Sequence, residues 1–356
     1  MRKFIHLFTI NIFLFFIFFL IGELTWRTVL SIKHFNNPNI NYFGKTWYRS
    51  NPKKITKFDK KLKFVTKPNI FIENVDIPRW KKNSTLTTND LGFRDNANNL
   101  SFTSNKRILA VGDSFTFGSQ VSDESTWPSC LERKLKIKLD NAGVGNYSTG
   151  QSIRRAIIES EKRKYSILIW SIYFHDFVRD FRQILIRDED NKVKFNNFKN
   201  LNKYNKKNSN FYNFLKEYSF IVYHGERVVK NIKKKFKKKS NLINQNENRF
   251  YNTDYNLIVE NINFLLNKFN DIQIEDKIIL YQYGADLDTA NKNIIRNIKK
   301  QIEEITLNKS ILIVDTLDIF QNLKDNEKHL IWFDHHTEFG NSEVCNYLLK
   351  NIKNIF

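Results

Sequence analysis

The segment from Arg107 to Gly118 constrains the fold of this chain more than any other. An apolar run from Ile108 to Val111 ends at Gly112, and Asp113 and Ser114 follow directly. Aliphatic runs of this kind favour a buried strand, whereas Asp and Ser are preferred residues at the start of a helix. Because glycine has no Cβ, the backbone can turn closely at this point. We therefore predict a strand that turns into a short helix at Ser114.

Ser114 is the candidate nucleophile. A hydroxyl at this turn lies at the open carboxyl end of a parallel strand, and the backbone N–H groups that follow point at whatever its oxygen attacks. An ordinary helix cap would use the same Gly-Asp-Ser sequence, so the interpretation depends on a base elsewhere in the chain.

A matching acid and base stand near the end of the sequence. After the apolar run from Leu330 to Phe333, the chain continues with Asp334, His335 and His336. Serine becomes an effective nucleophile when an imidazole takes its proton, and a carboxylate orients that imidazole. The sequence predicts a triad of Ser114, Asp334 and His336, with His335 as the alternative base.

Apolar segments alternate with helical ones from Lys106 onward. This alternation predicts a parallel sheet with helices on both faces, an α/β fold of three layers. A last helix from about Ser342 would close the sheet with Val344, Leu348, Ile352 and Ile355. The expected strands are Ile108 to Val111, Ile137 to Asn141, Ile167 to Tyr173, Ile278 to Tyr283 and Ile311 to Val314.

Four blocks of the chain resemble the SGNH, or GDSL-like, hydrolase family. The resemblance covers roughly residues 88–356 and implies a flavodoxin-like fold with about five parallel strands and a serine esterase activity. Residues 88–94 are similar to the approach segment of membrane-anchored bacterial members. The four blocks are residues 112–118 followed by 121–128, then 141–151, 173–176 and 334–341.

The same resemblance implies an oxyanion hole formed by the backbone N–H groups of Ser114, Gly145 and Asn146 and by the side chain of His175. Asn146 stands where the family has glycine, and its N–H keeps the right direction if Asn adopts a left-handed conformation. His175 replaces an asparagine, and its ring can also donate a hydrogen bond.

The identity of the base is a further departure. The Asp-x-His interval selects His336, whereas the family's spacing back from Gly340 selects His335. We favour His336, because adjacent side chains such as those of Asp334 and His335 point apart in extended backbone.

The N-terminus predicts a membrane anchor. The uncharged run from Phe4 to about Gly22 is long enough, at about 1.5 Å per residue, to cross about 30 Å of hydrocarbon. A cleaved signal peptide is the alternative, but no small-x-small cleavage site follows. We expect a transmembrane anchor at 1–25, a juxtamembrane arm at 26–105 and a catalytic domain at 106–356. This domain would be periplasmic or extracellular, because long domains translocate largely regardless of their charge.

A polar, Lys- and Asn-rich insertion interrupts the catalytic domain at about 187–255. Its helical candidate runs from Phe211 to Lys239, and a lid, a membrane-facing helix and a surface decoration are the alternatives. The net charge of +21 is spread over the chain without a nucleic-acid-binding motif, so no nucleic-acid partner is expected. No P-loop or metal-ligand spacing is found, and no cofactor or metal is expected.

Cys130 and Cys345 fall on the first and last expected helices of the catalytic domain. In a sheet of order 2-1-3-4-5 these helices share a face, which makes a disulfide possible, although we expect two separate buried thiols.

The function predicted from the sequence is a membrane-anchored esterase that removes small acyl groups, acetyl above all, from cell-envelope glycans. An O-acetyltransferase or accessory protein of polysaccharide modification or export is one alternative, and an inactive glycan-binding module is another.

Overall fold

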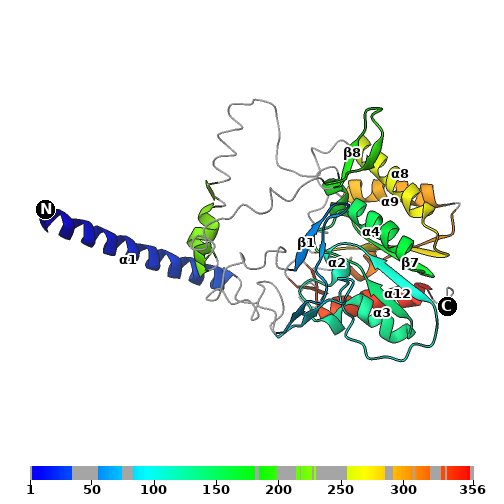
Figure 1. The fold of residues 1–356 in the computed structure, drawn as a ribbon, viewed down its shortest axis with the longest axis horizontal. Helices are drawn as coiled ribbons and strands as arrows, with labels where there is room; N and C mark the ends of the chain where they lie inside the picture. The colour runs from blue at the N-terminus through cyan, green and yellow to red at the C-terminus, as the bar shows by residue number, and fades with distance from the viewer. Residues whose placement is uncertain are drawn as a thin grey trace. The chain divides into compact units, whose positions relative to one another are not determined.

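The computed structural model describes residues 2–33, 55–73, 83–180, 184–198, 214–216, 218–226, 228–229, 255–284, 292–307, 309–320, 330–332 and 335–352. The chain forms two compact units (Figure 1). The first combines Met1–Asn51, Asp76–Arg79 and Asn202–Gln245, and the second contains Pro52–Val75, Trp80–Leu201 and Asn246–Phe356.

A five-stranded sheet forms the centre of the second unit. All its strands are parallel, and their spatial order is β11-β10-β7-β5-β6, which in chain order is the expected 2-1-3-4-5. Each predicted strand is confirmed to within two residues at either end. The strands are β5 (Arg107–Val111), β6 (Lys138–Asn141), β7 (Ile167–Tyr173), β10 (Asp276–Gln282) and β11 (Ile311–Asp315).

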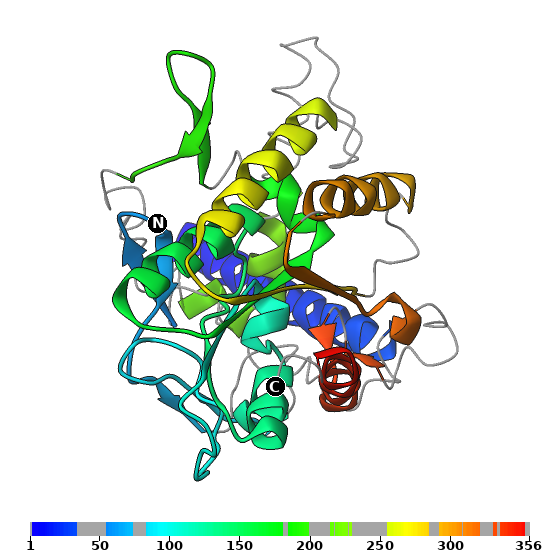
Figure 2. The same ribbon diagram turned by 90° about the vertical axis from the view of Figure 1, so that its right-hand side faces the viewer.

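Helices cover both faces of this sheet, which confirms the three-layer α/β/α fold. Helices α3 (Trp127–Leu135) and α12 (Glu338–Ile352) pack against each other on one face. Helices α4 (Thr149–Lys162), α8 (Tyr255–Asp271) and α9 (Lys292–Thr306) pack together on the opposite face (Figure 2). The apolar side chains between the layers form one continuous core.

The last helix begins earlier than predicted. Helix α12 starts at Glu338 rather than near Ser342, and it buries Val344, Leu348 and Ile352 as expected. Ile355 lies outside the described residues.

A disulfide joins the two helices of one face. Cys130 of α3 and Cys345 of α12 are bonded, with their Cα atoms 6.2 Å apart. The expectation of two separate thiols is therefore wrong. The 2-1-3-4-5 order brings the first and last helices of the domain side by side, so residues separated by 215 positions in the chain meet.

Part of the predicted arm packs into the second unit. Arg94 is 1% exposed, and its guanidinium donates hydrogen bonds to Asp123 and to the carbonyl oxygens of Phe117, Gly118 and Val121. The arm contributes two antiparallel pairs, β1 (Thr56–Asp59) with β2 (Lys63–Thr66) and β3 (Phe71–Ile72) with β4 (Leu86–Thr87).

Further short elements are α2 (Ser114–Phe117), η3 (Asp123–Ser125), η4 (Phe174–Arg179), β8 (Leu185–Arg187), β9 (Val193–Phe195), α10 (Leu317–Phe320), β12 (Ile331–Trp332) and β13 (His335–His336).

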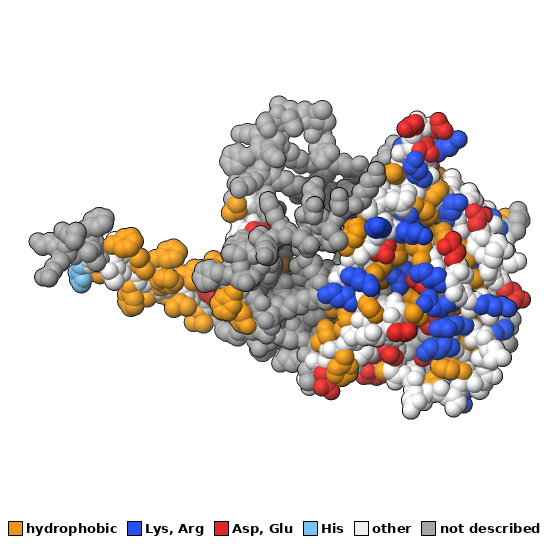
Figure 3. Space-filling model, in the orientation of Figure 1, with side chains coloured by type: hydrophobic (Ala, Val, Ile, Leu, Met, Phe, Trp, Pro, Cys, Tyr) orange, Lys and Arg blue, Asp and Glu red, His pale blue; other side chains and the backbone are white. Residues whose placement is uncertain are grey.

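The first unit contains helix α1 (Arg2–Lys33) and a helical part of the insertion. Within His6–Ile32 a window of 18 residues reaches a mean hydropathy of 2.3, and the stretch is long and apolar enough to cross a membrane (Figure 3). Of the helical candidate from Phe211 to Lys239, residues 214–216, 220–226 and 228–229 are helical, and most of the remainder lies outside the described residues.

Candidate active site

The turn between β5 and α2 holds Ser114 as the sequence predicts. A Cβ on Gly112 would lie 2.1 Å from Oγ1 of Thr116, so only glycine fits between β5 and α2. Asp113 is the N-cap of α2, and its Oδ1 accepts a hydrogen bond from the N–H of Phe115 at 3.0 Å. Gly118 ends the helix in the left-handed conformation, with φ of 74°. Ser114 therefore lies at the carboxyl end of a central strand.

His335 is the histidine that meets Ser114. Its Nε2 lies 2.7 Å from Oγ of Ser114. The Nε2 of His336 lies instead 2.7 Å from the carbonyl oxygen of Tyr283, the residue directly after β10. The expectation that His336 would contact the serine is therefore wrong.

His335 and His336 contact different residues because the backbone of β13 is extended. This two-residue strand pairs with β12, so the side chains of His335 and His336 point to opposite faces. The expectation for His336 relied on the same alternation between Asp334 and His335. Asp334 lies outside the described residues.

His336 is held as a neutral imidazole. A carbonyl oxygen only accepts hydrogen bonds, so the Nε2 of His336 carries the ring proton and donates a hydrogen bond to the carbonyl oxygen of Tyr283. The ring is 2% exposed and stacks on Phe320 at a centroid distance of 4.8 Å. Burial lowers the pKa of His336 to about 3. This residue anchors the histidine strand to the sheet.

Asp113 is a buried carboxylate beside the serine. Its Oδ2 lies 3.2 Å from Oγ of Ser114. Burial raises the pKa of Asp113, and the opposing charges of Arg179 and His335 limit the rise. From the sequence, Asp113 was expected only to cap the helix, although an Asp next to the candidate nucleophile also indicates an electrostatic role. The interaction of Arg179 with Asp113 was not expected.

Two of the three predicted backbone donors, Gly145 and Asn146, lie in the loop after β6. The N–H of Val144 donates to the carbonyl oxygen of Gly112 at 3.2 Å, which ties this loop to the nucleophile turn. Asn146 has φ of 67°, so it adopts the left-handed conformation that the prediction required. Among the described residues, no acceptor takes the N–H groups of Ser114, Gly145 or Asn146. Their role as an oxyanion hole stays a prediction.

His175 lies in η4, directly after β7 and therefore at the same edge of the sheet as Ser114. Its ring is 5.2 Å from the ring of Tyr173, which in turn is 4.8 Å from that of Phe115. The ring of Phe115 also packs 5.0 Å from His335. Aromatic packing thus connects His175 with the Ser114–His335 pair.

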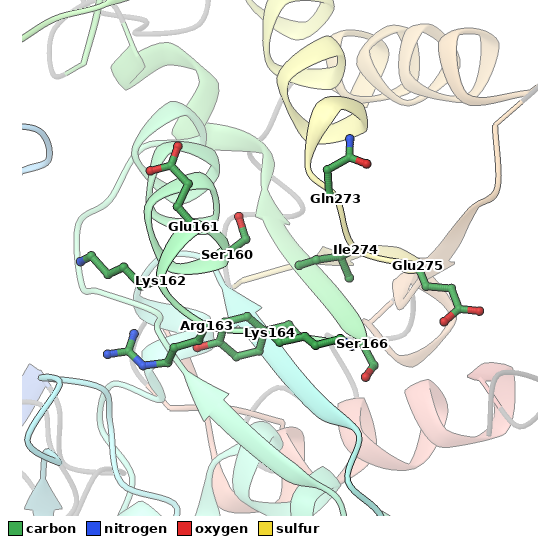
Figure 4. A pocket seen from close by; sticks show the side chains of 10 residues that line it. Ser160, Glu161, Lys162, Arg163, Lys164, Ser166, Gln273, Ile274 and Glu275 are labelled. Carbon is green, nitrogen blue, oxygen red and sulfur yellow. The ribbon is translucent and has the colours of Figure 1, made fainter.

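A cavity of about 460 Å³ lies at a different place (Figure 4). It is lined by residues 160–166 and 273–275, which directly precede β7 and β10. This is the amino edge of the sheet, whereas Ser114 follows the carboxyl end of β5. The cavity is therefore separate from the candidate active site.

The sequence matches no protein-family model and no curated protein. Several solved structures are distantly similar to this chain. A lipolytic protein of the G-D-S-L family from Desulfitobacterium hafniense is 14% identical, with a TM-score of 0.41, over 69% of this chain and 99% of that one. A member of the same family from Veillonella parvula is 11% identical, with a TM-score of 0.43, over 70% and 98%.

An acetylxylan esterase from Geobacillus stearothermophilus is 13% identical, with a TM-score of 0.39, over 71% of this chain and 96% of that protein. The chain itself has a doubly wound α/β fold of order 2-1-3-4-5, and its candidate site is a serine and a histidine at the carboxyl edge of this parallel sheet.

Proposed function

We propose that this chain is a membrane-anchored serine esterase that removes small acyl groups, acetyl above all, from cell-envelope glycans. The observation that carries the proposal is the 2.7 Å distance between Nε2 of His335 and Oγ of Ser114. This distance allows the imidazole to take the hydroxyl proton directly.

The reaction follows the usual course of a serine esterase. Oγ of Ser114 attacks the ester carbonyl while its proton passes to Nε2 of His335. The resulting oxyanion is bound by the N–H groups of Ser114, Gly145 and Asn146, and His175 adds a side-chain donor. The protonated His335 then gives its proton to the departing sugar oxygen, which leaves an acyl-serine. Water, deprotonated by His335, attacks the acyl carbon, and His335 returns the proton to Oγ of Ser114 as the bond between Oγ and the acyl carbon breaks and the carboxylic acid is released.

Asp334 is the proposed carboxylate partner of His335, a role that requires a backbone between the two residues that is not extended, since adjacent side chains point apart in extended backbone. A carboxylate near the imidazole stabilises the cation that forms during proton transfer. Asp113 provides a second negative charge at the site when it is ionised, because it lies beside Ser114 and interacts electrostatically with His335.

Two observations support a place outside the cytoplasm, anchored by α1. The Cys130–Cys345 disulfide is typical of an oxidising compartment. In addition, Glu23 of α1 accepts hydrogen bonds from residues 219–221 of the insertion. A helix that makes specific contacts with the rest of the chain is suited to an anchor that is retained rather than to a cleaved signal peptide. The acetyl group and the glycan follow from this location and from the family that the sequence resembles.

Turnover of 4-nitrophenyl acetate by the full chain in detergent tests the proposal. We expect Ser114→Ala to lose at least about a thousandfold in kcat/KM with an unchanged melting temperature. Ser101→Ala, at an exposed serine, is the matched control and should be fully active. Mass spectrometry should find an acetylated peptide that contains Ser114. Equal turnover by wild type and Ser114→Ala would overturn the proposal.

A transferase would give a different result with the same protein. Product formation that requires an acceptor sugar, with little release of acetate to water, would replace the hydrolase by an O-acetyltransferase that uses the same serine.

A further inference from the structure

The apolar part of α1 ends at a buried ion pair. Glu23 and Arg27 are 9% and 8% exposed, and Nε of Arg27 donates to Oε1 of Glu23 at 2.8 Å. Most side chains on α1 between residues 7 and 29 are exposed, so these two charged residues mark the one side that is covered. Such burial of charge needs a partner that supplies hydrogen bonds.

The partner is the insertion. The carboxylate of Glu23 accepts hydrogen bonds from Oγ of Ser219 at 2.8 Å, from the N–H of Phe220 at 2.7 Å and from the N–H of Ile221 at 2.9 Å. Arg27 donates to the carbonyl oxygen of Tyr218 and lies 4.7 Å from the ring centre of Phe220. Glu23 therefore caps the helical stretch 220–226 from another segment of the chain.

The position of Glu23 along α1 indicates at which depth of a membrane its contact with the insertion would lie. The uncharged run from Phe4 to Gly22 extends over roughly 28 Å at about 1.5 Å per residue, close to the thickness of the hydrocarbon layer. If α1 crosses the bilayer as proposed above, Glu23 lies at the boundary between lipid and water. The stretch of the insertion that it holds then lies at the same level.

This stretch exposes apolar side chains that nothing in the described part of the first unit covers. Phe214, Tyr218, Val228 and Val229 are 54%, 42%, 54% and 49% exposed. The rings of Phe214 and Tyr218 pack against each other at 4.8 Å. Aromatic residues are enriched at the membrane surface, and Trp26 of α1, close to Glu23 in the sequence, is 44% exposed. In sequence the next residues, 233–239, contain six lysines, which suit anionic lipid headgroups.

We propose that residues 214–229 are a membrane-surface element, and that their partner is the bilayer through which α1 passes. Glu23 and Arg27 hold the element to the end of the anchor, and its exposed apolar side chains lie in the boundary layer between headgroups and acyl chains. This attaches the insertion, and with it a second point of the catalytic chain, to the membrane. The proposal rests on the membrane anchoring and is independent of the esterase chemistry.

Depth-dependent quenching in lipid nanodiscs tests it. The two native cysteines form the disulfide, so a single introduced cysteine in the full chain can carry a fluorescent label without reduction. The labelled variants are Val228→Cys for the element, Leu14→Cys for the middle of α1 and Lys192→Cys for an exposed site in the second unit. Phosphatidylcholine with brominated acyl chains is the quencher.

We expect strong quenching at position 14, clear quenching at position 228 and little at position 192. Quenching at 14 but not at 228 would overturn the membrane-surface element while the anchor stands. Absence of quenching at 14 would show that α1 does not cross the bilayer, which would overturn the anchor and this inference together. Turnover of 4-nitrophenyl acetate by the same samples reports on the esterase separately.

A second variant tests the link to α1. Glu23→Gln replaces a charged acceptor of three hydrogen bonds, and we expect the fraction of the element that is released from α1 to rise about tenfold or more. Cleavage of the insertion by a protease should rise accordingly. Thr25→Gln, at an exposed position of the same helix, is the control and should leave cleavage unchanged. Equal cleavage of wild type and Glu23→Gln would show that Glu23 does not hold the element.

Discussion

Nε2 of His335 lies 2.7 Å from Oγ of Ser114, although the two residues are 221 positions apart in the chain. The contact is possible because α2 begins at the end of β5 and because β13 places His335 at the same edge of the sheet. The adjacent His336 faces away and contacts Tyr283. Neighbouring histidines thus have different chemical environments.

The first prediction concerns these two histidines. His335→Ala should lower kcat/KM by about a thousandfold or more and leave the melting temperature nearly unchanged, because it removes the proposed base. His336→Ala should instead destabilise the fold by roughly 1–3 kcal/mol, because it removes a buried hydrogen bond to Tyr283. Rate constants and melting curves of both variants check this. A larger catalytic loss in the folded His336 variant would assign the base to His336.

Much of this arrangement could be predicted from the sequence. The apolar runs around Ile108, Ile167 and Ile278 are buried on both faces of a parallel sheet, so their pattern alone indicated the strands and the layers. Gly112 and Asp113 also predicted the turn, because a close approach and a helix cap each require specific residue types.

What the sequence did not predict depends on contacts between distant residues. The choice between His335 and His336 depends on the register of β13, a strand of two residues that no periodicity marks. The fully buried Arg94 donates hydrogen bonds to the carbonyl oxygens of Phe117 and Gly118. A basic residue in a polar segment gives no indication of such a tertiary contact. The interaction of Glu23 with the insertion is of the same kind.

The second prediction is a pH effect on stability from His336. Its pKa is about 3 in the folded protein, below its ordinary value of 6.5. Between these values the unfolded chain binds a proton that the folded chain does not, so stability falls as pH falls, by about 1.4 kcal/mol per unit. His336→Gln retains a donor for Tyr283 and cannot titrate. From pH 6.5 to 5, the free energy of unfolding of wild type should therefore fall by roughly 2 kcal/mol more than that of the variant.

Denaturant titrations of both proteins across this range check the difference. The comparison is needed because burial raises the pKa of Asp180 to about 6, and protonation of that group stabilises the folded protein as pH falls. This contribution is common to both proteins and cancels. If the free energies of unfolding of wild type and His336→Gln changed equally with pH, the neutral, buried state of His336 would be contradicted.

The third prediction separates the two carboxylates. If Asp334 orients His335, Asp334→Asn should lower kcat on the order of a thousandfold. Asp113→Asn keeps an oxygen that can accept from the N–H of Phe115 and should lower kcat much less. Single-turnover rates with 4-nitrophenyl acetate check the ranking. The opposite ranking would make Asp113 the carboxylate that supports the imidazole.

The last prediction concerns the disulfide between α3 and α12. Helix α12 follows the histidine strand directly, and Oδ1 of Asn341 accepts a hydrogen bond from the N–H of Trp127 at 3.1 Å. The bond between Cys130 and Cys345 closes a loop of 215 residues, so its loss should lower the free energy of unfolding by roughly 3–5 kcal/mol. Denaturant titrations with and without dithiothreitol measure this. The Cys130→Ala, Cys345→Ala double variant is the control, since it should match the reduced wild type and ignore the reductant. Identical curves for oxidised and reduced wild type would show that the bond does not constrain the unfolded chain.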